Sequence, residues 1–383
     1  MNGSVQGGSM PWLRRLLLRA IELLAVAGVL LLVLAILDVP SLDSFSDAQV
    51  KQRRYANSEN VFRAEGYSRY HVNSYGLIGK EPLPLDTPHV YRIAVFGDSY
   101  VQALQVDATQ NFTGLLEQRL SPPPGFAAVE TWNFGFAGDN TGNSYARWLY
   151  MAHGVPFNAV VFAFNDGDPE ENRPGDVAAP SGAYLVPAAP GGYRLVYPEH
   201  AVAASWTERW LRPYFGQLVF SQFTIRNRLH DYIARLPHWD SKAQALAATP
   251  HRDAIDQAEL AAQITETANQ LAFVVHKIAA TGATVVLLAI PSHYAVAPEL
   301  YPDLGIKRQR IYRALTARLR SAGLPLVDPY SDLQAALTHG EDPYGAWEPG
   351  GHLNRQGHAL IAAALAQALV SRSARTGMAV MGH

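Results

Sequence analysis

The chain has 383 residues, with 31 Lys and Arg against 33 Asp and Glu, and it contains no cysteine. A net charge of −2 gives no reason to expect nucleic acid as a partner. The lack of cysteine excludes disulfides and thiolate metal sites, while the length is enough for one large domain or two small ones.

Residues 11–38 hold the longest apolar run of the chain. No polar side chain occurs between Leu23 and Leu37, and the apolar character extends back to Leu16. A helix that crosses a bilayer needs ~20 mostly apolar residues. Arginines precede this run and aspartates follow it, namely Arg14, Arg15, Arg19, Asp38, Asp43 and Asp47. The positive-inside rule therefore predicts a transmembrane helix over residues 11–38, a cytoplasmic tail over residues 1–10, and an extracytoplasmic location for all later residues.

A cleavable signal peptide is the alternative interpretation of the same run. Val33-Leu34-Ala35 is compatible with a cleavage site. The apolar run is long for a signal peptide, which favours an anchor that is retained.

Residues 39–88 are polar and show no sustained hydrophobic period. They are rich in Ser, Asp, Asn and Arg, and we predict a tether with a partly ordered lead-in to the domain. The segment Asn73–Gly79 contains turn-forming residues, which predicts that it packs near the start of a sheet.

The stretch Tyr91–Val106 (YRIAVFGDSYVQALQV) is the centre of the pattern. An apolar run, Tyr91–Phe96, ends at Gly97-Asp98-Ser99, which predicts a buried parallel strand followed by a tight turn. Ser99 then lies just beyond the carboxyl end of the strand, where open α/β sheets bind their ligands. Such a turn alone is a weak signal, so its meaning depends on residues further along the chain.

Strands and helices alternate after this turn. Further strands are predicted at residues 127–134, 159–164, 283–290 and 324–327, and helices at residues 112–120, 260–278, 308–320 and 356–370. This alternation predicts an α/β domain over residues 89–370, with a doubly wound five-stranded parallel sheet covered by helices on both faces. Residues 371–383 are predicted to be a disordered tail.

An insertion over residues 168–250 separates the third and fourth strands. It contains a predicted hairpin, Tyr184–Pro187 and Tyr193–Tyr197, which turns at Gly191-Gly192. Aromatic residues follow at Trp206, Trp210, Tyr214, Phe220 and Phe223. Core packing of an inserted helical pair is the favoured interpretation of these aromatics, and a lid or substrate-binding wall is the alternative.

Four polar or flexible positions fall at predicted strand ends or loops. Ser99 is a nucleophile that needs a base, and His352 lies on the loop before the last helix. Gly138 offers an unobstructed backbone N–H, and Asn165 offers a side-chain amide. Acyl transfer requires this set, which comprises a hydroxyl, an imidazole that moves its proton, and donors aimed at an oxyanion. Each residue alone has a simpler explanation, but their order and placement together indicate a catalytic site.

These residues resemble the motifs of the SGNH/GDSL hydrolases, in the membrane-anchored bacterial type. Gly97-Asp98-Ser99 is similar to the nucleophile block, and Asn133–Asp139 to the block whose glycine supplies an oxyanion N–H. Phe164-Asn165-Asp166 resembles the third block, although Ala163 stands where that block has glycine. His352-Leu353-Asn354 with Gly357-His358 is similar to the last block. The resemblance implies a five-stranded parallel sheet, Ser99 and His352 as catalytic residues, an oxyanion hole of Ser99, Gly138 and Asn165, and neither metal nor cofactor.

The position of the catalytic acid departs from this family. An Asp usually stands two or three residues before the histidine, where this chain has Gly350 and Pro349. We predict that Glu348 is the acid partner of His352. A backbone carbonyl in that role and a weak activity are the next interpretations, with Asp342 a more distant carboxylate. His358 is a poorer candidate for the base, because it falls inside the last predicted helix.

The resemblance implies an extracytoplasmic serine esterase or O-acyltransferase in a bacterial inner membrane, with its domain in the periplasm. We expect O-acyl esters, acetyl above all, of a cell-envelope or exported polysaccharide as substrates, and no nucleic acid. The sequence does not separate hydrolysis from transfer. One alternative is a non-catalytic accessory subunit that binds glycan or a membrane acyltransferase. Another is a lysophospholipase, in which the aromatic insertion forms the groove for a lipid ester.

Overall fold

The central sheet of the computed structural model has five parallel strands in the order β11-β10-β7-β5-β6. The structure describes residues 11–36, 44–62, 65, 67–173, 182–197, 257–345 and 351–380. The strands are β5 (Val90–Phe96), β6 (Ala128–Asn133), β7 (Ala159–Asn165), β10 (Thr284–Ile290) and β11 (Leu326–Val327). The prediction of a five-stranded parallel sheet is therefore confirmed, with strand ends that differ by at most two residues.

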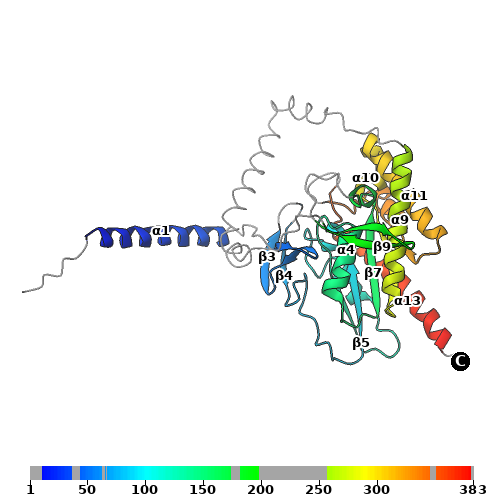
Figure 1. Cartoon of the computed structure of the whole chain (residues 1–383), viewed down its shortest axis with the longest axis horizontal. Helices are drawn as coiled ribbons and strands as arrows, with labels where there is room; N and C mark the ends of the chain where they lie inside the picture. The colour runs from blue at the N-terminus through cyan, green and yellow to red at the C-terminus, as the bar shows by residue number, and fades with distance from the viewer. Residues whose placement is uncertain are drawn as a thin grey trace, which may run out of the picture.

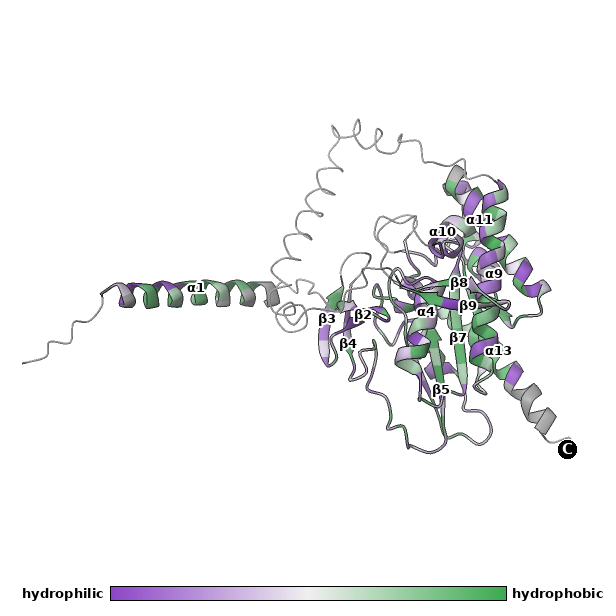
Figure 2. Cartoon of the chain, in the orientation of Figure 1, coloured by the Kyte–Doolittle hydropathy of each residue, from purple (hydrophilic) through white to green (hydrophobic). Residues whose placement is uncertain are grey.

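Helices cover both faces of this sheet (Figure 1). On one face, Phe96 of β5 and Phe162 of β7 share a hydrophobic cluster with the helices α9 (Gln257–Ala279) and α11 (Pro302–Ser321). On the other face, Val95 and Val161 share a cluster with α3 (Phe112–Arg119), α12 (Tyr330–Thr338) and α13 (Arg355–Val380). All side chains of β5 and β7 are buried, and Figure 2 shows that most of their residues are hydrophobic; the buried Arg92 of β5 pairs with Glu130 of β6. Apolar side chains on both faces are the pattern that a strand between two helical layers requires.

The strand order creates a switch point next to β5. The chain pairs β5 with β6 on one side and with β7 on the other, so the connections that follow β5 and β7 leave toward opposite faces. Ser99 lies directly after β5, and Asn165 is the last residue of β7. The order of the strands therefore brings these two predicted site residues to one edge of the sheet.

Several short helices lie in the connections between the strands of the sheet. They are α2 (Ser99–Gln102), α4 (Thr141–Arg147), the π-helix η1 (Trp148–Ala152), α5 (Asp168–Glu171), α10 (His293–Val296) and the 3₁₀ helix η2 (Pro298–Leu300). The hairpin of β8 (Tyr184–Ala188) and β9 (Gly192–Val196) is antiparallel, as predicted. The aromatic residues Trp206, Trp210, Tyr214, Phe220 and Phe223 lie outside the described residues.

Residues 39–88, predicted to be a tether with a partly ordered lead-in, are more ordered in their described part than a tether would be. They form β1 (Ser44–Asp47) and β2 (Lys51–Arg54), and then β3 (Ser58–Phe62) and β4 (Ser68–Val72), each pair antiparallel. Arg147 of α4 donates to the carbonyl oxygens of Gln52 and Val50 at 3.0 and 3.1 Å. These strands have only four or five residues and mostly polar sequences, so no alternation of apolar and polar residues predicts them. Hydrogen bonds to the domain stabilise them instead.

The carboxyl end of the chain also differs from the prediction. Helix α13 continues to Val380, so residues 371–380 are helical rather than part of a disordered tail. Most of these residues are compatible with a helix and none is proline, so nothing in the sequence ends α13 at residue 370.

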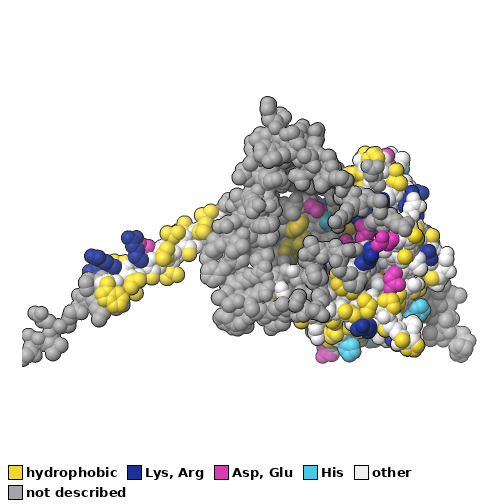
Figure 3. Space-filling model, turned by 45° about the horizontal axis from the view of Figure 1, so that its top comes forward, with side chains coloured by type: hydrophobic (Ala, Val, Ile, Leu, Met, Phe, Trp, Pro, Cys, Tyr) yellow, Lys and Arg dark blue, Asp and Glu magenta, His cyan; other side chains and the backbone are white. Residues whose placement is uncertain are grey.

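At the amino terminus, α1 (Pro11–Ile36) is a helix of 26 residues. Apolar side chains run along it, with basic side chains toward its amino-terminal end (Figure 3). Among the residues that the structure describes, no helix qualifies as long and apolar enough to span a membrane.

Candidate active site

The turn after β5 depends on Gly97. This residue has a φ of +156°, and a Cβ atom there would lie 2.5 Å from Cγ2 of Val101 and 3.1 Å from Cβ of Ala163. Without a side chain, the chain can turn sharply and begin α2 directly against the end of the strand. Asp98 caps this helix, since its carboxylate accepts from the N–H of Tyr100 at 2.9 Å. Ser99 becomes the first residue of α2, with its hydroxyl at the edge of the sheet.

Ser99, His352 and Glu65 form a continuous chain of hydrogen-bonded contacts. Nε2 of His352 lies 2.7 Å from Oγ of Ser99, and Nδ1 lies 2.6 Å from Oε2 of Glu65. The same carboxylate oxygen accepts from the backbone N–H of His352 at 3.0 Å. A carboxylate accepts but does not donate, so it holds the proton on Nδ1 and leaves Nε2 free to accept from the serine hydroxyl. This is the arrangement of a nucleophile, a base and an orienting acid.

Glu65 and His352 each favour the charged form of the other residue. Burial alone would lower the pKa of His352, but the hydrogen bond and charge of Glu65, together with the charge of Asp98, raise it above the ordinary value. The hydrogen bond from His352 lowers the pKa of Glu65, and this outweighs the opposing effect of burial. Glu65 therefore stays ionised at neutral pH and stabilises an imidazolium at His352.

The loop over residues 135–139 supplies one free backbone donor. The N–H groups of Gly135, Phe136, Ala137 and Asp139 donate to Oδ1 of Asn133, the carbonyl of Gly97, Oε1 of Gln102 and the carbonyl of Phe136, at 2.9 to 3.1 Å. Among the described residues, the N–H of Gly138 has no acceptor within hydrogen-bonding distance. Gly138 has a φ of +69°, a conformation that favours glycine. The loop thus presents one amide hydrogen, at the position predicted from the sequence.

Asn165 is held in place by Asp98. Its Nδ2 donates to Oδ2 of Asp98 at 2.7 Å, and its Oδ1 accepts from the N–H of Gly167. A side-chain amide nitrogen carries two hydrogens, so one remains after the bond to Asp98. The N–H of Ser99 is also available, because the first N–H groups of a helix have no partner within it. Ser99, Gly138 and Asn165 therefore each retain a donor hydrogen that an oxyanion can accept.

Burial changes the protonation of the cap residue. Burial raises the pKa of Asp98 to about 7, and the nearby charge of Glu171 adds to this effect. Asp98 is therefore partly protonated at neutral pH, which reduces the negative charge next to Ser99.

Glu65 was not predicted from the sequence as the acid partner of His352. This residue lies between β3 and β4, at a separation of 287 positions from His352, and no spacing motif connects the two. Glu348, the predicted acid, lies outside the described residues. Asp342 accepts from the N–H of Tyr344 at 2.9 Å and has an oxygen 3.9 Å from Nε2 of His293, so it is directed elsewhere.

His358 is not part of this site. It is fully buried in α13, and its Nδ1 accepts from the N–H of Phe112 at 3.3 Å. Burial, together with the charge of His352, lowers the pKa of His358 to about 3, so it stays neutral. In the described part of the chain, no group of three or more His, Asp or Glu side chains is arranged to hold a metal ion.

Several solved structures are similar to this chain. They include a lipolytic protein of the G-D-S-L family from Veillonella parvula, with 12% identity, coverage of 72% of this chain and 96% of that chain, and a TM-score of 0.39. A lipase/acylhydrolase from Enterococcus faecalis has 14% identity, coverage of 73% of this chain and 96% of that chain, and a TM-score of 0.39. A catalytic mutant of an acetylxylan esterase from Geobacillus stearothermophilus has 13% identity, coverage of 73% of this chain and 93% of that chain, and a TM-score of 0.37. No family model and no curated protein matches the sequence.

The contact with Glu65 predicts the titration of His352. In the wild-type protein, we expect NMR of the imidazole nitrogens to give a pKa for His352 above the ordinary value of 6.5. In Glu65→Gln the pKa should fall, because the charge that opposes desolvation is gone. Glu59→Gln is the matched control, since Oε1 of Glu59 lies 2.7 Å from Nδ1 of His71 and this carboxylate pairs with His71 rather than with His352. An unchanged titration of His352 in Glu65→Gln would contradict the electrostatic assignment.

Proposed function

We propose that this protein is a serine esterase or O-acyltransferase in which Ser99 is the nucleophile, His352 the base and Glu65 the orienting acid. The observation that carries this proposal is the chain of contacts from Oγ of Ser99 through the imidazole of His352 to the carboxylate of Glu65, at 2.7 and 2.6 Å. Glu65 takes the role that the sequence suggested for Glu348. With this acid present, the main argument for a non-catalytic accessory subunit loses its basis.

The geometry supports the following acylation step. Nε2 of His352 takes the proton of Ser99 as Oγ attacks the ester carbonyl, and the carbonyl oxygen becomes an oxyanion. The N–H groups of Ser99 and Gly138 and the side-chain amide of Asn165 are its donors. Glu65 keeps Nδ1 protonated and stabilises the imidazolium, as an acid does in a triad. His352 then returns the proton to the leaving alkoxide, and the acyl group remains on Oγ.

Deacylation repeats these roles with a new nucleophile. Water or a hydroxyl of an acceptor loses a proton to His352 and attacks the acyl carbon. The bond to Oγ of Ser99 then breaks, and His352 returns the proton to that oxygen. Water gives hydrolysis, and a sugar hydroxyl gives transfer. Both outcomes use the same residues, so the acceptor that reaches the site decides between them.

We further propose that residues 11–38 anchor the protein in a bacterial inner membrane, although no helix of the described residues qualifies as a membrane span. The support is the sequence of the helix, which has no polar side chain from Leu23 onward and carries Arg14, Arg15 and Arg19 before its apolar part. A periplasmic domain held there meets O-acyl, mainly acetyl, esters of envelope or exported polysaccharide, which we propose as substrates.

Ser99 is expected to react with a fluorophosphonate probe, because an activated serine forms a stable bond to phosphorus. Ser99→Ala should remove the labelling, as followed by in-gel fluorescence. Ser292→Ala is a matched control, since the hydroxyl of Ser292 donates to Asp166 and makes no hydrogen bond to a histidine among the described residues. Labelling that persists in Ser99→Ala would identify another nucleophile, and an unlabelled wild type would favour the accessory-subunit alternative.

Glu65→Gln should lower the turnover of an aryl acetate by about two to four powers of ten, as expected for neutralisation of a triad acid. The effect should vanish in a His352→Ala background, because residues that act as a unit are not additive. Glu59→Gln should stay within a factor of a few of wild type. A large loss in Glu348→Gln together with near-normal turnover in Glu65→Gln would return the role to Glu348.

The proposed topology is tested with reporter fusions placed after residue 60. An alkaline phosphatase fusion is expected to be active, because that enzyme matures outside the cytoplasm, whereas a fusion to a reporter that works only in the cytoplasm should be silent. The reverse pattern would refute the extracytoplasmic location of the domain.

A further inference from the structure

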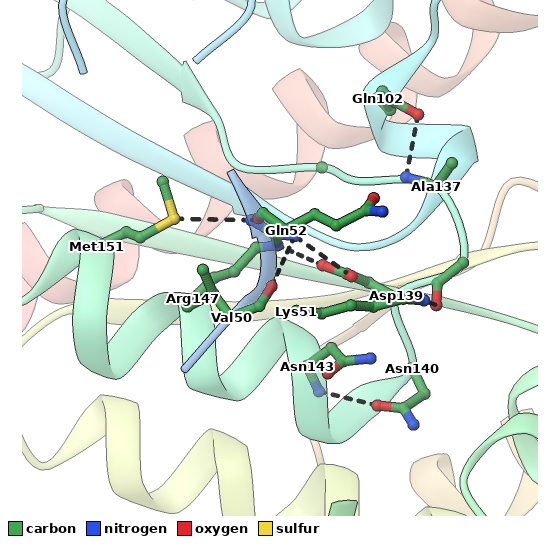
Figure 4. Close-up of polar contacts among 12 residues, drawn as sticks. Val50, Lys51, Gln52, Gln102, Ala137, Asp139, Asn140, Asn143, Arg147 and Met151 are labelled. Carbon is green, nitrogen blue, oxygen red and sulfur yellow. Dashed lines mark hydrogen bonds and ion pairs between the residues drawn. The ribbon is translucent and has the colours of Figure 1, made fainter. Parts of the chain in front are cut away.

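The turn between β1 and β2 contacts the loop that carries Gly138 (Figure 4). Nζ of Lys51 donates to the carbonyl oxygen of Gly138 at 2.8 Å. Arg54 of the same hairpin donates to the carbonyl oxygen of Gly135 at 3.1 Å. The hairpin therefore binds this loop at two carbonyl groups, one at each end of a four-residue stretch.

A buried arginine fixes the hairpin to the other side of the same loop. The guanidinium of Arg147 pairs with Asp139, the residue after Gly138, and both side chains are at most 2% exposed. The same guanidinium donates to the carbonyl oxygens of Val50 and Gln52, the two residues that flank Lys51. Lys51 and Gly138 are thus held opposite each other by contacts that do not involve the lysine side chain.

Lys51 has a strained backbone. Its φ is +66°, and the N–H of Gln52 donates across it to the carbonyl of Val50 at 2.7 Å, which makes a tight turn of the type that favours glycine. A lysine in this conformation costs free energy that glycine would not. Such strain is common at functional sites, where a side chain is needed at a position that its backbone disfavours.

Gly138 is the residue of the loop that most needs such a restraint. Glycine has the widest backbone freedom, and the N–H of Gly138 has no acceptor among the described residues. The preceding N–H, of Ala137, is bound to Gln102 in α2, the helix that begins at Ser99. With the carbonyl of Gly138 bound to Lys51, the residue is restrained on both sides, and the direction of its N–H is set relative to Ser99.

We propose that Lys51 is a positioning residue that acts through Gly138 and orients its N–H toward the oxyanion of the acyl-transfer reaction. This inference rests on the proposed function, and it assigns to the hairpin β1–β2 a part in catalysis besides the one that Glu65 gives to the hairpin β3–β4. The step that Lys51 affects is formation of the tetrahedral intermediate, because its oxyanion requires the donor more than the substrate carbonyl does.

The test compares Lys51→Met, Lys51→Arg and Lys51→Gly in the full chain with an aryl acetate. Lys51→Met is expected to lower kcat about 10- to 100-fold with KM within about twofold, since a misdirected donor costs less than a deleted one. Lys51→Arg should recover most of this loss, because it keeps a cationic donor. Lys51→Gly should lower kcat like Lys51→Met while its melting temperature stays at or above that of wild type, which separates catalysis from folding.

Lys80→Met is the matched control. Its ammonium pairs with Glu117 at 2.5 Å on the surface, so kcat should not change. A kcat of Lys51→Met within twofold of wild type would overturn the proposal. A parallel rise of KM in the same variant, or a failure of Lys51→Arg to recover activity, would also overturn it.

Amide hydrogen exchange tests the same contact without turnover. The N–H of Asp139 donates to the carbonyl of Phe136 at 3.0 Å, so its exchange reports whether the loop is held. We expect faster exchange in peptides that cover residues 135–139 in Lys51→Met, and wild-type exchange in Lys80→Met. Unchanged exchange in Lys51→Met would overturn the proposal. A wild type with neither turnover nor fluorophosphonate labelling would instead refute the proposed function, whatever the exchange shows.

Discussion

The hydrogen bond between Glu65 and His352 is the contact on which the candidate site depends. One oxygen of the carboxylate accepts from both Nδ1 and the backbone N–H of the histidine, so it fixes the ring and the main chain together. The two residues lie far apart in the sequence, Glu65 in a short hairpin before the sheet and His352 in the loop before α13. The base therefore has its acid only when the amino-terminal hairpins are docked on the domain, and folding and assembly of the site are one process.

The sheet provides the fixed frame for these loops. Strands β5 and β7 are buried on both faces, and close packing of this kind leaves little room for their ends to shift. Glycines let the loops approach that frame closely, since a Cβ atom at Gly135 would lie 2.4 Å from the backbone nitrogen of Gln102. The positions of Ser99 and Gly138 relative to each other thus follow from backbone packing, and the side chains of Asn165, Gln102 and Lys51 complete the alignment.

The electrostatics near Ser99 depend on burial as much as on the number of charges. Burial raises the pKa of Asp98 to about 7 and also raises the pKa values of Asp139 and Asp166. The charge of Arg147 opposes this effect at Asp139, and hydrogen bonds from Ser292 with the charge of Arg308 oppose it at Asp166. Glu65 differs from these three, because its bond to His352 lowers its pKa. An oxyanion at Ser99 is consequently next to Asp98, a carboxyl that burial makes easier to protonate, while the charge that the mechanism needs remains on Glu65.

The sequence by itself determined the sheet, the helices on its faces, and the placement of Ser99, Gly138, Asn165 and His352 at strand ends and loops. These features depend on local patterns: apolar runs as long as a strand, helical periodicity, and glycine where the chain must turn. The acid and the strands β1 to β4 were decided by the tertiary structure. Glu65 is an ordinary carboxylate in a polar segment, and no local pattern distinguishes it from Glu59 or Glu348. It becomes the partner of His352 because the hairpin β3–β4 is docked on the domain, where Oγ of Ser68 donates to the carbonyl of Leu104 and Tyr70 packs in a cluster with Ile78. Such contacts between distant segments leave no periodic signal in the sequence.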